Sequence, residues 1–167
     1  MVVLTFTNFF TYFFIAWSAN ISLNLLYVVK RYAPDFKHLN YPLDFKTNFR
    51  GERLIGDSVN IIGLIFCLAI SLAVYSATAT IIWASIPVIV YVGNLLGSFI
   101  KRRMHLKSGE FLPIIDHGDY MLLLGIVFTS LHYIEPLFAI LAILLTYILH
   151  PIACLVAFKF KLRENPY

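Results

Sequence analysis

Charged residues are scarce in this chain of 167 residues: they make up 13% of it, whereas hydrophobic residues make up 60% and the mean hydropathy is +0.80. A soluble globular domain carries about 25% charged and about 45–50% apolar residues. The composition therefore excludes a disordered chain, a fibrous repeat and an ordinary water-soluble enzyme. It indicates an integral membrane protein that places most of its surface in lipid.

Cysteine and N-terminal positive charge are also scarce. Cys67 and Cys154 are the only cysteines, and each lies within an apolar run without CxxC spacing. They cannot form a secreted-type disulfide framework, so we expect two small buried residues of membrane helices. No Lys or Arg precedes Lys30. A secretory signal peptide needs a positive segment ahead of a short apolar stretch, so the first apolar run is predicted to be a retained membrane span.

Several common catalytic motifs are absent. The sequence contains no GxSxG, no HExxH, no Walker loop and no DGxxAR…GxxxDxxxD pattern of the CDP-alcohol phosphotransferases. His132 and His150 are isolated, and we expect neither to be a metal ligand. The few charged residues within apolar runs do not form the paired ion pathway that a transporter needs.

Hydrophobic runs predict five membrane spans, because a bilayer core about 30 Å thick needs roughly 20 apolar residues in a helix. Runs 3–29, 78–100 and 135–158 meet this length, and the charge-free run 59–75 also qualifies. The fourth span is long enough only if it begins near Ile114, which places Asp116 and Asp119 below the headgroups. The predicted fold class is all-α: a polytopic integral membrane protein with five transmembrane helices and one catalytic domain, 1–167.

All thirteen Lys and Arg residues fall on one side of these spans, in segments 30–57 and 101–115 and after the fifth span. Basic loops favour the cytoplasmic side. We therefore predict a multi-pass protein of the cell membrane with its N-terminus outside, its C-terminus cytoplasmic, two cytoplasmic loops at about 30–57 and 101–115, and an active site facing the cytoplasm. Basic residues at helix ends also have a simpler role, contact with anionic headgroups; this interpretation is favoured for Lys30, Arg31, Arg103, Lys159, Lys161 and Arg163.

The motif Asp116-His117-Gly118-Asp119 is the sharpest local feature. Positions i and i+3 share a helix face, so the two carboxylates point the same way at a depth where each is expensive to bury. A divalent cation offsets this cost, and Mg²⁺ takes one or two carboxylates together with water and phosphate oxygens. The alternative is that one Asp caps the helix while the other pairs with a nearby Lys or Arg.

A polar stripe is predicted at the cytoplasmic end of the third span; it consists of Asn94, Ser98, Lys101 and Arg102. An amide, a hydroxyl and two cations along one face are typical of a phosphate-binding wall. Gly93 and Gly97 form a GxxxG in the same span, which favours close packing of another helix. The two interpretations are compatible.

The first loop and the first span hold the remaining polar candidates. The loop contains Arg50, Arg53 and Asp57, and Asp57 could instead be a plain N-cap of the second span. In the first span Ser and Asn each recur at i+4, which favours hydrogen bonds between helices; the residues are Ser18, Ser22, Asn20 and Asn24.

Three segments of the sequence carry a family resemblance: 40–44 continuing to 50–58, then 93–103, then 112–120. Their motifs, NYPLD with RGERLIGDS, GNLLGSFIKRR and LPIIDHGDY, resemble those of the archaeal CDP-archaeol synthases. These are small polytopic cytidylyltransferases related to bacterial phosphatidate cytidylyltransferases. One departure is plain: after Gly-Asp-Ser the family commonly continues with Lys-Thr, whereas this chain has Val59 and Asn60.

The resemblance implies transfer of CMP from CTP to an unsaturated archaeal ether-lipid phosphate, 2,3-bis-O-(geranylgeranyl)-sn-glycerol 1-phosphate, giving CDP-archaeol and pyrophosphate with Mg²⁺ as cofactor. It implies that Asp116 and Asp119, with Asp57, hold the metal, and that Lys101 is catalytic. The implied ligands of CTP and its phosphates are Arg50, Arg53, Asn94, Ser98, Lys101, Arg102 and Asp44. The predicted partners are CTP, the isoprenoid ether-lipid phosphate and the lipid bilayer, with no nucleic acid.

Two other functions fit the same sequence features. A different cytoplasm-facing lipid phosphatase or transferase would share the basic cavity but release no pyrophosphate. A membrane scaffold or transporter subunit would have no catalysis and no stabilisation by CTP with Mg²⁺. The sequence does not set the oligomeric state.

Overall fold

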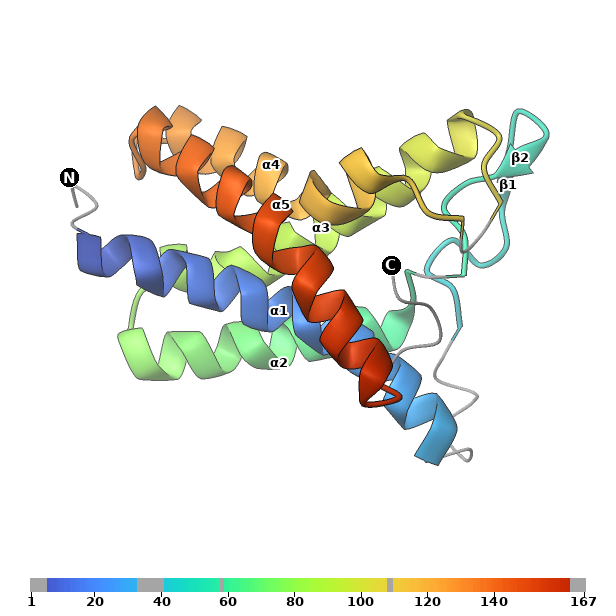
Figure 1. Cartoon of the computed structure of the whole chain (residues 1–167), viewed down its shortest axis with the longest axis horizontal. Helices are drawn as coiled ribbons and strands as arrows, with labels where there is room; N and C mark the ends of the chain where they lie inside the picture. The colour runs from blue at the N-terminus through green and yellow to red at the C-terminus, as the bar shows by residue number, and fades with distance from the viewer. Residues whose placement is uncertain (1–5, 33–40, 58, 108–109, 163–167) are drawn as a thin grey trace.

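The computed structural model describes residues 6–32, 41–57, 59–107 and 110–162, and five helices dominate it (Figure 1). They are α1 (Phe6–Tyr32), α2 (Ile61–Thr78), α3 (Ile81–Arg103), α4 (Pro113–Ser130) and α5 (Pro136–Lys159). A short antiparallel hairpin, β1 (Asn48–Phe49) and β2 (Glu52–Arg53), lies in the loop between α1 and α2. The helical class is confirmed, and the hairpin is an addition that the sequence did not predict.

The helix boundaries follow local capping chemistry. Asn60 is the N-cap of α2, because its side chain accepts a hydrogen bond of 2.9 Å from the backbone N–H of Gly63. The alternative of Asp57 as the N-cap is therefore wrong. At the other end α2 runs to Thr78 and stops at Ala79, which has a left-handed φ of 50°. The turn between the second and third helices thus lies about three residues later than the hydrophobic runs predict.

The start of α4 bears on the predicted fourth span. The helix begins at Pro113, a residue that suits the first turn because no N–H is needed there. Asp116 therefore lies in the first turn of the helix and Asp119 one turn further on. The backward extension of this helix to about Ile114 is confirmed. The helix ends at Ser130, before the turn that leads into α5.

Helix α3 is the centre of the bundle, packing against α1, α2 and α4, while α5 packs against α4. Phe9 and Tyr12 of α1, Ile86 of α3 and Leu124 of α4 are fully buried in the main core. The GxxxG prediction of close packing is confirmed at Gly93: a Cβ there would lie only 2.5 Å from the Cα of Tyr120. A glycine at this position lets the backbones of α3 and α4 approach each other.

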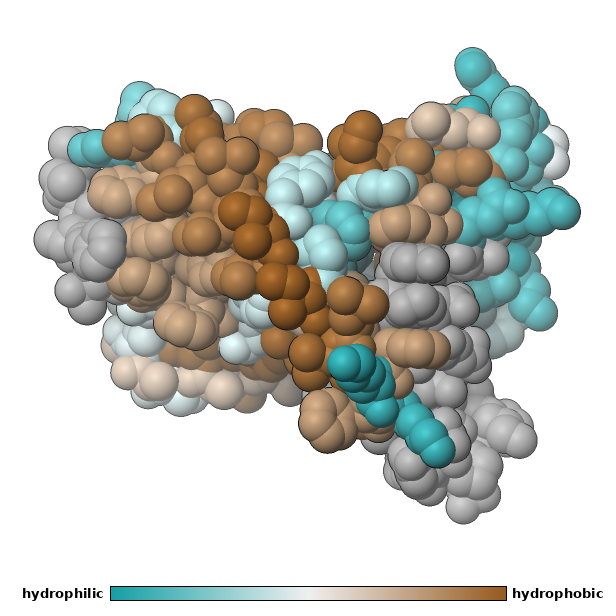
Figure 2. Space-filling model, viewed as in Figure 1, coloured by the Kyte–Doolittle hydropathy of each residue, from teal (hydrophilic) through white to brown (hydrophobic). Residues whose placement is uncertain are grey.

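The outer surface of the bundle is apolar. Helices α2, α3 and α5 are long and apolar enough to cross a membrane by length and composition. Large side chains such as Leu72 on α2 and Ile148 on α5 are more than half exposed, which suits lipid better than water. Figure 2 shows this face as largely brown, with teal residues gathered at the end that carries β1 and β2. Cys67 and Cys154 are buried thiols, as expected.

Candidate active site between α3 and α4

The carboxylate of Asp116 joins α4 to α3. One oxygen accepts a hydrogen bond of 2.5 Å from Nζ of Lys101, and the other accepts one of 2.6 Å from the backbone N–H of Leu112. The Lys101 side chain is 10% exposed and the Asp116 side chain 23%. Asp116 thus both caps the helix start and pairs with a cation, the two roles that the alternative interpretation divided between the two aspartates.

The carboxylate of Asp119 lies against Gly97 of α3. A Cβ at Gly97 would lie 2.0 Å from Oδ2 of Asp119, so the carboxylate reaches this place only because position 97 has no side chain. Its Oδ1 accepts a hydrogen bond of 2.7 Å from the backbone N–H of Tyr120. Within the described residues, no Lys, Arg or His nitrogen lies within 4.0 Å of this carboxylate. Both aspartates face α3, as their i, i+3 spacing predicts.

Two buried cations stand at the same end of α3. Lys101 is 8% exposed and Arg102 is 5% exposed. Arg102 donates to the carbonyl of Lys107 at 3.0 Å, but its Nε is buried without a hydrogen-bond partner. Across the described ranges, no carboxylate lies within 4.0 Å of its guanidinium. A buried guanidinium without a carboxylate carries a large desolvation cost. A phosphate would offset it, because its oxygens accept hydrogen bonds from the planar fork of guanidinium N–H groups.

The rest of the predicted stripe follows α3 toward the middle of the bundle. Asn94 donates to the carbonyl of Val90 at 2.9 Å and to the side chain of Asn20 on α1 at 3.3 Å. Ser98 is buried one turn closer to Lys101. The hydrogen bond from Asn94 to Asn20 confirms the predicted interhelical role of Asn20.

The two serines of α1 differ from that prediction. They bond to carbonyls of their own helix, Ser18 to Phe14 and Ser22 to Ala19, because a short hydroxyl reaches the preceding turn more easily than a neighbouring helix. The side chain of Asn24 lies outside the described residues.

Asp44 organises the first loop. Its side chain has no exposed surface and accepts hydrogen bonds from Arg53 and from the backbone N–H groups of Lys46, Ile55 and Gly56. Burial acts to raise the pKa of Asp44, but the hydrogen bonds from Arg53, Ile55 and Lys46 outweigh it, so the pKa lies below its ordinary value. These contacts give Asp44 a structural role, and its predicted place beside the nucleotide stays a prediction.

Arg53 holds Asp57 within the same loop. Its guanidinium contacts Asp44 at 2.9 Å and Asp57 at 3.2 Å, and the Asp57 side chain is 63% exposed. In the part of the chain that the structure describes, no three His, Cys, Asp or Glu side chains are grouped closely enough to share a metal ion. The structure therefore brings Asp116 and Asp119 together on α4 but does not gather Asp57 with them.

Arg50 and Arg103 meet at the hairpin. Arg50 is exposed at its tip with a left-handed φ of 54°, followed by Gly51 with φ 84°, the two positive values of a type I′ turn. Arg103, at the end of α3, donates to the carbonyls of Phe49 at 2.6 Å and Arg53 at 2.7 Å. These contacts fasten the first loop to the end of α3 that carries Lys101, while the contact of Arg103 with headgroups stays a prediction.

Sequence reasoning missed a contact between α4 and α5. Nδ1 of His117 lies 2.8 Å from Nδ1 of His150, so His150 is not isolated. The spacing of 33 residues between the two histidines contains no periodicity that predicts this contact. No metal group of three or more side chains forms around them in the described residues.

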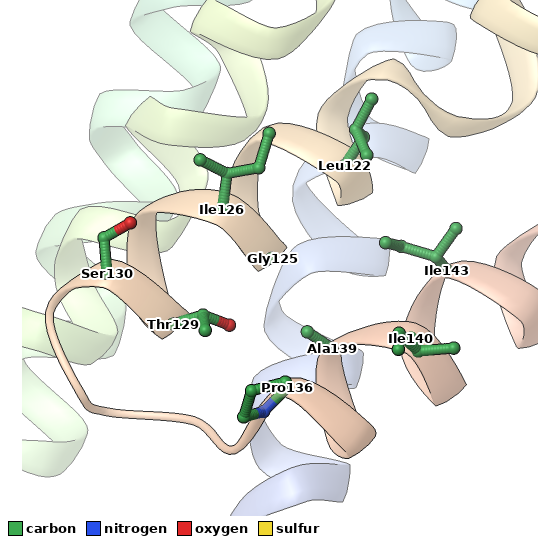
Figure 3. A pocket seen from close by; sticks show the side chains of 9 residues that line it. All are labelled: Leu122, Gly125, Ile126, Thr129, Ser130, Pro136, Ala139, Ile140 and Ile143. Atoms are coloured by element: carbon green, nitrogen blue, oxygen red, sulfur yellow. The ribbon is translucent and has the colours of Figure 1, made fainter.

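An apolar groove also separates α4 from α5, nearer to the turn between them. It has a volume of about 330 Å³, and Figure 3 shows Leu122, Ile126 and Ile143 around it, with Thr129 and Ser130 as its polar residues. No titratable side chain lines this groove. The candidate catalytic residues lie at the other end of α4.

Comparison with known proteins places this geometry in a family. The profile of the CarS-like family, CDP-archaeol synthase, matches residues 78–167. The chain belongs to the CDP-archaeol synthase family. The matched range contains α3, α4 and α5, and so both sides of the Lys101–Asp116 contact. The resemblance seen in the sequence is confirmed.

Individual members of the CDP-archaeol synthase family align over most of the chain. The protein of Sulfolobus acidocaldarius is 30% identical over 135 residues, covering 75% of this chain and 83% of that protein. The protein of Pyrobaculum arsenaticum is 32% identical over 136 residues, covering 76% and 82%. A solved structure of an intramembrane enzyme for archaeal membrane lipids biosynthesis is similar with a TM-score of 0.67 and 25% identity, covering 90% of this chain and 95% of that one.

Proposed function

We propose that this chain is a membrane cytidylyltransferase of archaeal lipid synthesis. It transfers CMP from CTP to 2,3-bis-O-(geranylgeranyl)-sn-glycerol 1-phosphate, giving CDP-archaeol and pyrophosphate. Family membership supports the activity. The observation that carries the proposal for this chain is the contact between Lys101 on α3 and Asp116 on α4. The buried Arg102 lies at the same end of α3, and Asp119 lies against Gly97 on the same face of α4.

The proposed topology has all five helices crossing the membrane as one catalytic domain over residues 1–167. The N-terminus is outside, and the C-terminus and the basic loops are in the cytoplasm, where CTP is available. The apolar surfaces of α2, α3 and α5 support the membrane location, and the basic loops support the orientation. The active site then lies at the cytoplasmic face of the cell membrane.

The reaction joins two phosphates. An oxygen of the lipid phosphate attacks the α-phosphorus of CTP, a new P–O bond forms, and the bond from the α-phosphorus to the bridging β-oxygen breaks, so that pyrophosphate leaves. The attacking oxygen is already anionic and needs no strong general base. The protein therefore has two tasks, to align the two phosphates and to neutralise their charge.

Residues of α3 and of the first loop together bind the phosphates. Arg102 has a buried Nε without a partner and suits a phosphate of CTP. Lys101 holds Asp116 in place through their contact and stands beside the reacting phosphates. Asn94 and Ser98 supply an amide and a hydroxyl for phosphate oxygens, while Arg50 and Arg53 neutralise the triphosphate from the loop that Arg103 fastens to α3.

Asp116 and Asp119 fit a magnesium site. They are two carboxylates on one face of α4, and Mg²⁺ commonly takes one or two carboxylates and completes its shell with water and substrate phosphates. When bound, Mg²⁺ supplies positive charge that neutralises the phosphate oxygens. Asp57, the predicted third ligand, would first have to release its contact with Arg53.

The test is an assay of the purified protein with radiolabelled CTP, Mg²⁺ and an ether-linked lipid phosphate. The proposal predicts label in the lipid phase together with one pyrophosphate for each CDP-lipid formed. A lipid phosphatase would release inorganic phosphate without pyrophosphate. A scaffold or transporter subunit would incorporate no label and show no rise of Tm with CTP and Mg²⁺; either result contradicts the proposal.

A further inference from the structure

The motif 116–119 presents two different faces of α4 to its two neighbours. Asp116 contacts Lys101, and Asp119 lies against Gly97, both on α3. The two residues between them turn the other way, because His117 contacts His150 and Gly118 lies against Tyr147, both on α5. The helix turn that carries both candidate metal ligands is therefore held from behind by α5.

Tyr147 supports this turn through a hydrogen bond and through its shape. Its hydroxyl donates to the backbone carbonyl of Ile114, in the first turn of α4, at 2.5 Å. A Cβ at Gly118 would lie 2.6 Å from the Tyr147 hydroxyl oxygen and 2.8 Å from Cε2 of its ring. Glycine at position 118 thus allows the ring to lie directly against the backbone of α4.

His150 supports the same turn through the His117 side chain. The two Nδ1 atoms are 2.8 Å apart, so one ring donates and the other accepts. Both histidines are buried, and their ring centroids are 5.0 Å apart. The pair fixes the rotation of α4 about its own axis at the residue between the two aspartates.

These contacts lie where α4 and α5 begin to separate. Pro151 stands inside α5 four residues after Tyr147, so no N–H of residue 151 is available for the Tyr147 carbonyl. Figure 1 shows α5 diverging from α4 toward its C-terminal end, and a patch of polar residues interrupts the brown surface in this region in Figure 2. The contacts of Tyr147 and His150 therefore hold the start of α4 from the α5 side, while Lys101 and Gly97 contact it from the α3 side.

We propose that Tyr147 and His150 are positioning residues for the cytidylyl-transfer site. They hold the turn 114–118 from the α5 side, so that Asp116 faces Lys101 and Asp119 faces Gly97 of α3. This inference rests on the proposed function. The inference adds a role for two α5 residues, which act through their contacts with α4.

The test measures metal response as well as turnover. The first readout is the Mg²⁺ concentration that gives half of the CTP-dependent rise in Tm, and the second is kcat and KM for the lipid phosphate. Tyr147→Phe and His150→Leu are each expected to raise the half-saturating Mg²⁺ concentration about three- to tenfold, the effect of one lost hydrogen bond. They are also expected to lower kcat about tenfold while leaving KM for the lipid phosphate near its wild-type value.

Two further variants separate positioning from general loss of stability. His150→Asn retains a polar group near the place of Nδ1 and is expected to recover most of the metal response. Tyr91→Phe is the matched control: it removes a buried phenol-to-carbonyl hydrogen bond of 2.8 Å, from Tyr91 to Asn60, away from the carboxylates. It is expected to lower Tm without changing the half-saturating Mg²⁺ concentration.

A wild-type metal response in both Tyr147→Phe and His150→Leu would overturn the inference. If Tyr147→Phe does not fold, Gly118→Ala serves in its place, because the added Cβ displaces the Tyr147 ring from α4; an unchanged metal response there has the same meaning. Failure of the proposed function looks different: the wild-type protein itself would then transfer no CMP and show no rise of Tm with CTP and Mg²⁺.

Discussion

Replacing Gly97 with alanine is expected to lower cytidylyl transfer about 100-fold with little loss of folding. The added Cβ would lie 2.0 Å from Oδ2 and 2.9 Å from Cγ of Asp119. The carboxylate then has to move by about 1.5 Å to regain an ordinary van der Waals separation. A displacement of about 1 Å at a group that positions reactants lowers the rate about 100-fold. The assay is the transfer of label from CTP into the lipid phase.

The stability of the same variant separates a local effect from a general one. Alanine favours a helix over glycine by about 1 kcal/mol, while the new contact costs about 1–3 kcal/mol, so Tm should change by only a few degrees. Gly93→Ala is the control, because its Cβ would lie 2.5 Å from the Cα of Tyr120. A backbone atom cannot rotate away, so this variant should lose more Tm. Wild-type turnover in Gly97→Ala would refute the assignment of Asp119 to the site.

Three further substitutions give distinct outcomes. Arg102→Met should raise KM for CTP about tenfold, because it removes the proposed phosphate contact. It should not lower Tm, because the buried charge that it removes has no carboxylate partner among the described residues. A lower Tm with unchanged KM would contradict this. Lys101→Met should lower Tm by about 6–12 °C, because it leaves Asp116, which is 23% exposed, without its cation at a cost of about 3 kcal/mol, and about 1 kcal/mol corresponds to about 2–4 °C in a chain of this size. An unchanged Tm would argue against that contact. Asp44→Asn should speed proteolysis of loop 41–57 at pH 7. The ionised form of Asp44 is favoured in the folded loop, so its stabilisation is present above the unfolded pKa and disappears as the pH falls through the lowered folded value. The difference between variant and wild type should therefore shrink as the pH falls below about 4, the ordinary value for Asp, and a difference that does not shrink there would contradict it.

The helical fold could be predicted well because apolar runs of about 20 residues have few alternatives in a membrane. The start of α4 at Pro113 was the least obvious helix boundary. It was predicted near Ile114, because the fourth apolar run is long enough to cross a membrane only with this extension. The interpretation of Asp57 as the N-cap of α2 was wrong. Asp57 and Asn60 are both good N-cap residues, and sequence alone does not choose between them. In the structure the Asp57 carboxylate contacts Arg53 in the loop, and the Asn60 side chain accepts the capping hydrogen bond.

The candidate site could be predicted where its residues share one helix. The i, i+3 spacing of Asp116 and Asp119 and the run from Asn94 to Arg102 each define a helix face without tertiary information. Contacts between helices could not be predicted, because nothing in the local pattern pairs His117 with His150. The loop contacts of Asp44 were also hidden, since the groups that bind it lie up to twelve residues further along the chain and are mostly backbone N–H groups.

The most direct test of the central claim is metal binding at Asp119, measured by electron paramagnetic resonance with Mn²⁺ as the probe in the presence of CTP. The account predicts that wild-type protein with CTP removes more free Mn²⁺ from solution than the same concentration of CTP without protein. Asp119→Asn should weaken this binding about tenfold or more. Glu135→Gln, the same change of carboxylate to amide at the other end of the bundle, should bind as wild type does. Equal Mn²⁺ binding by Asp119→Asn and wild type would contradict the account.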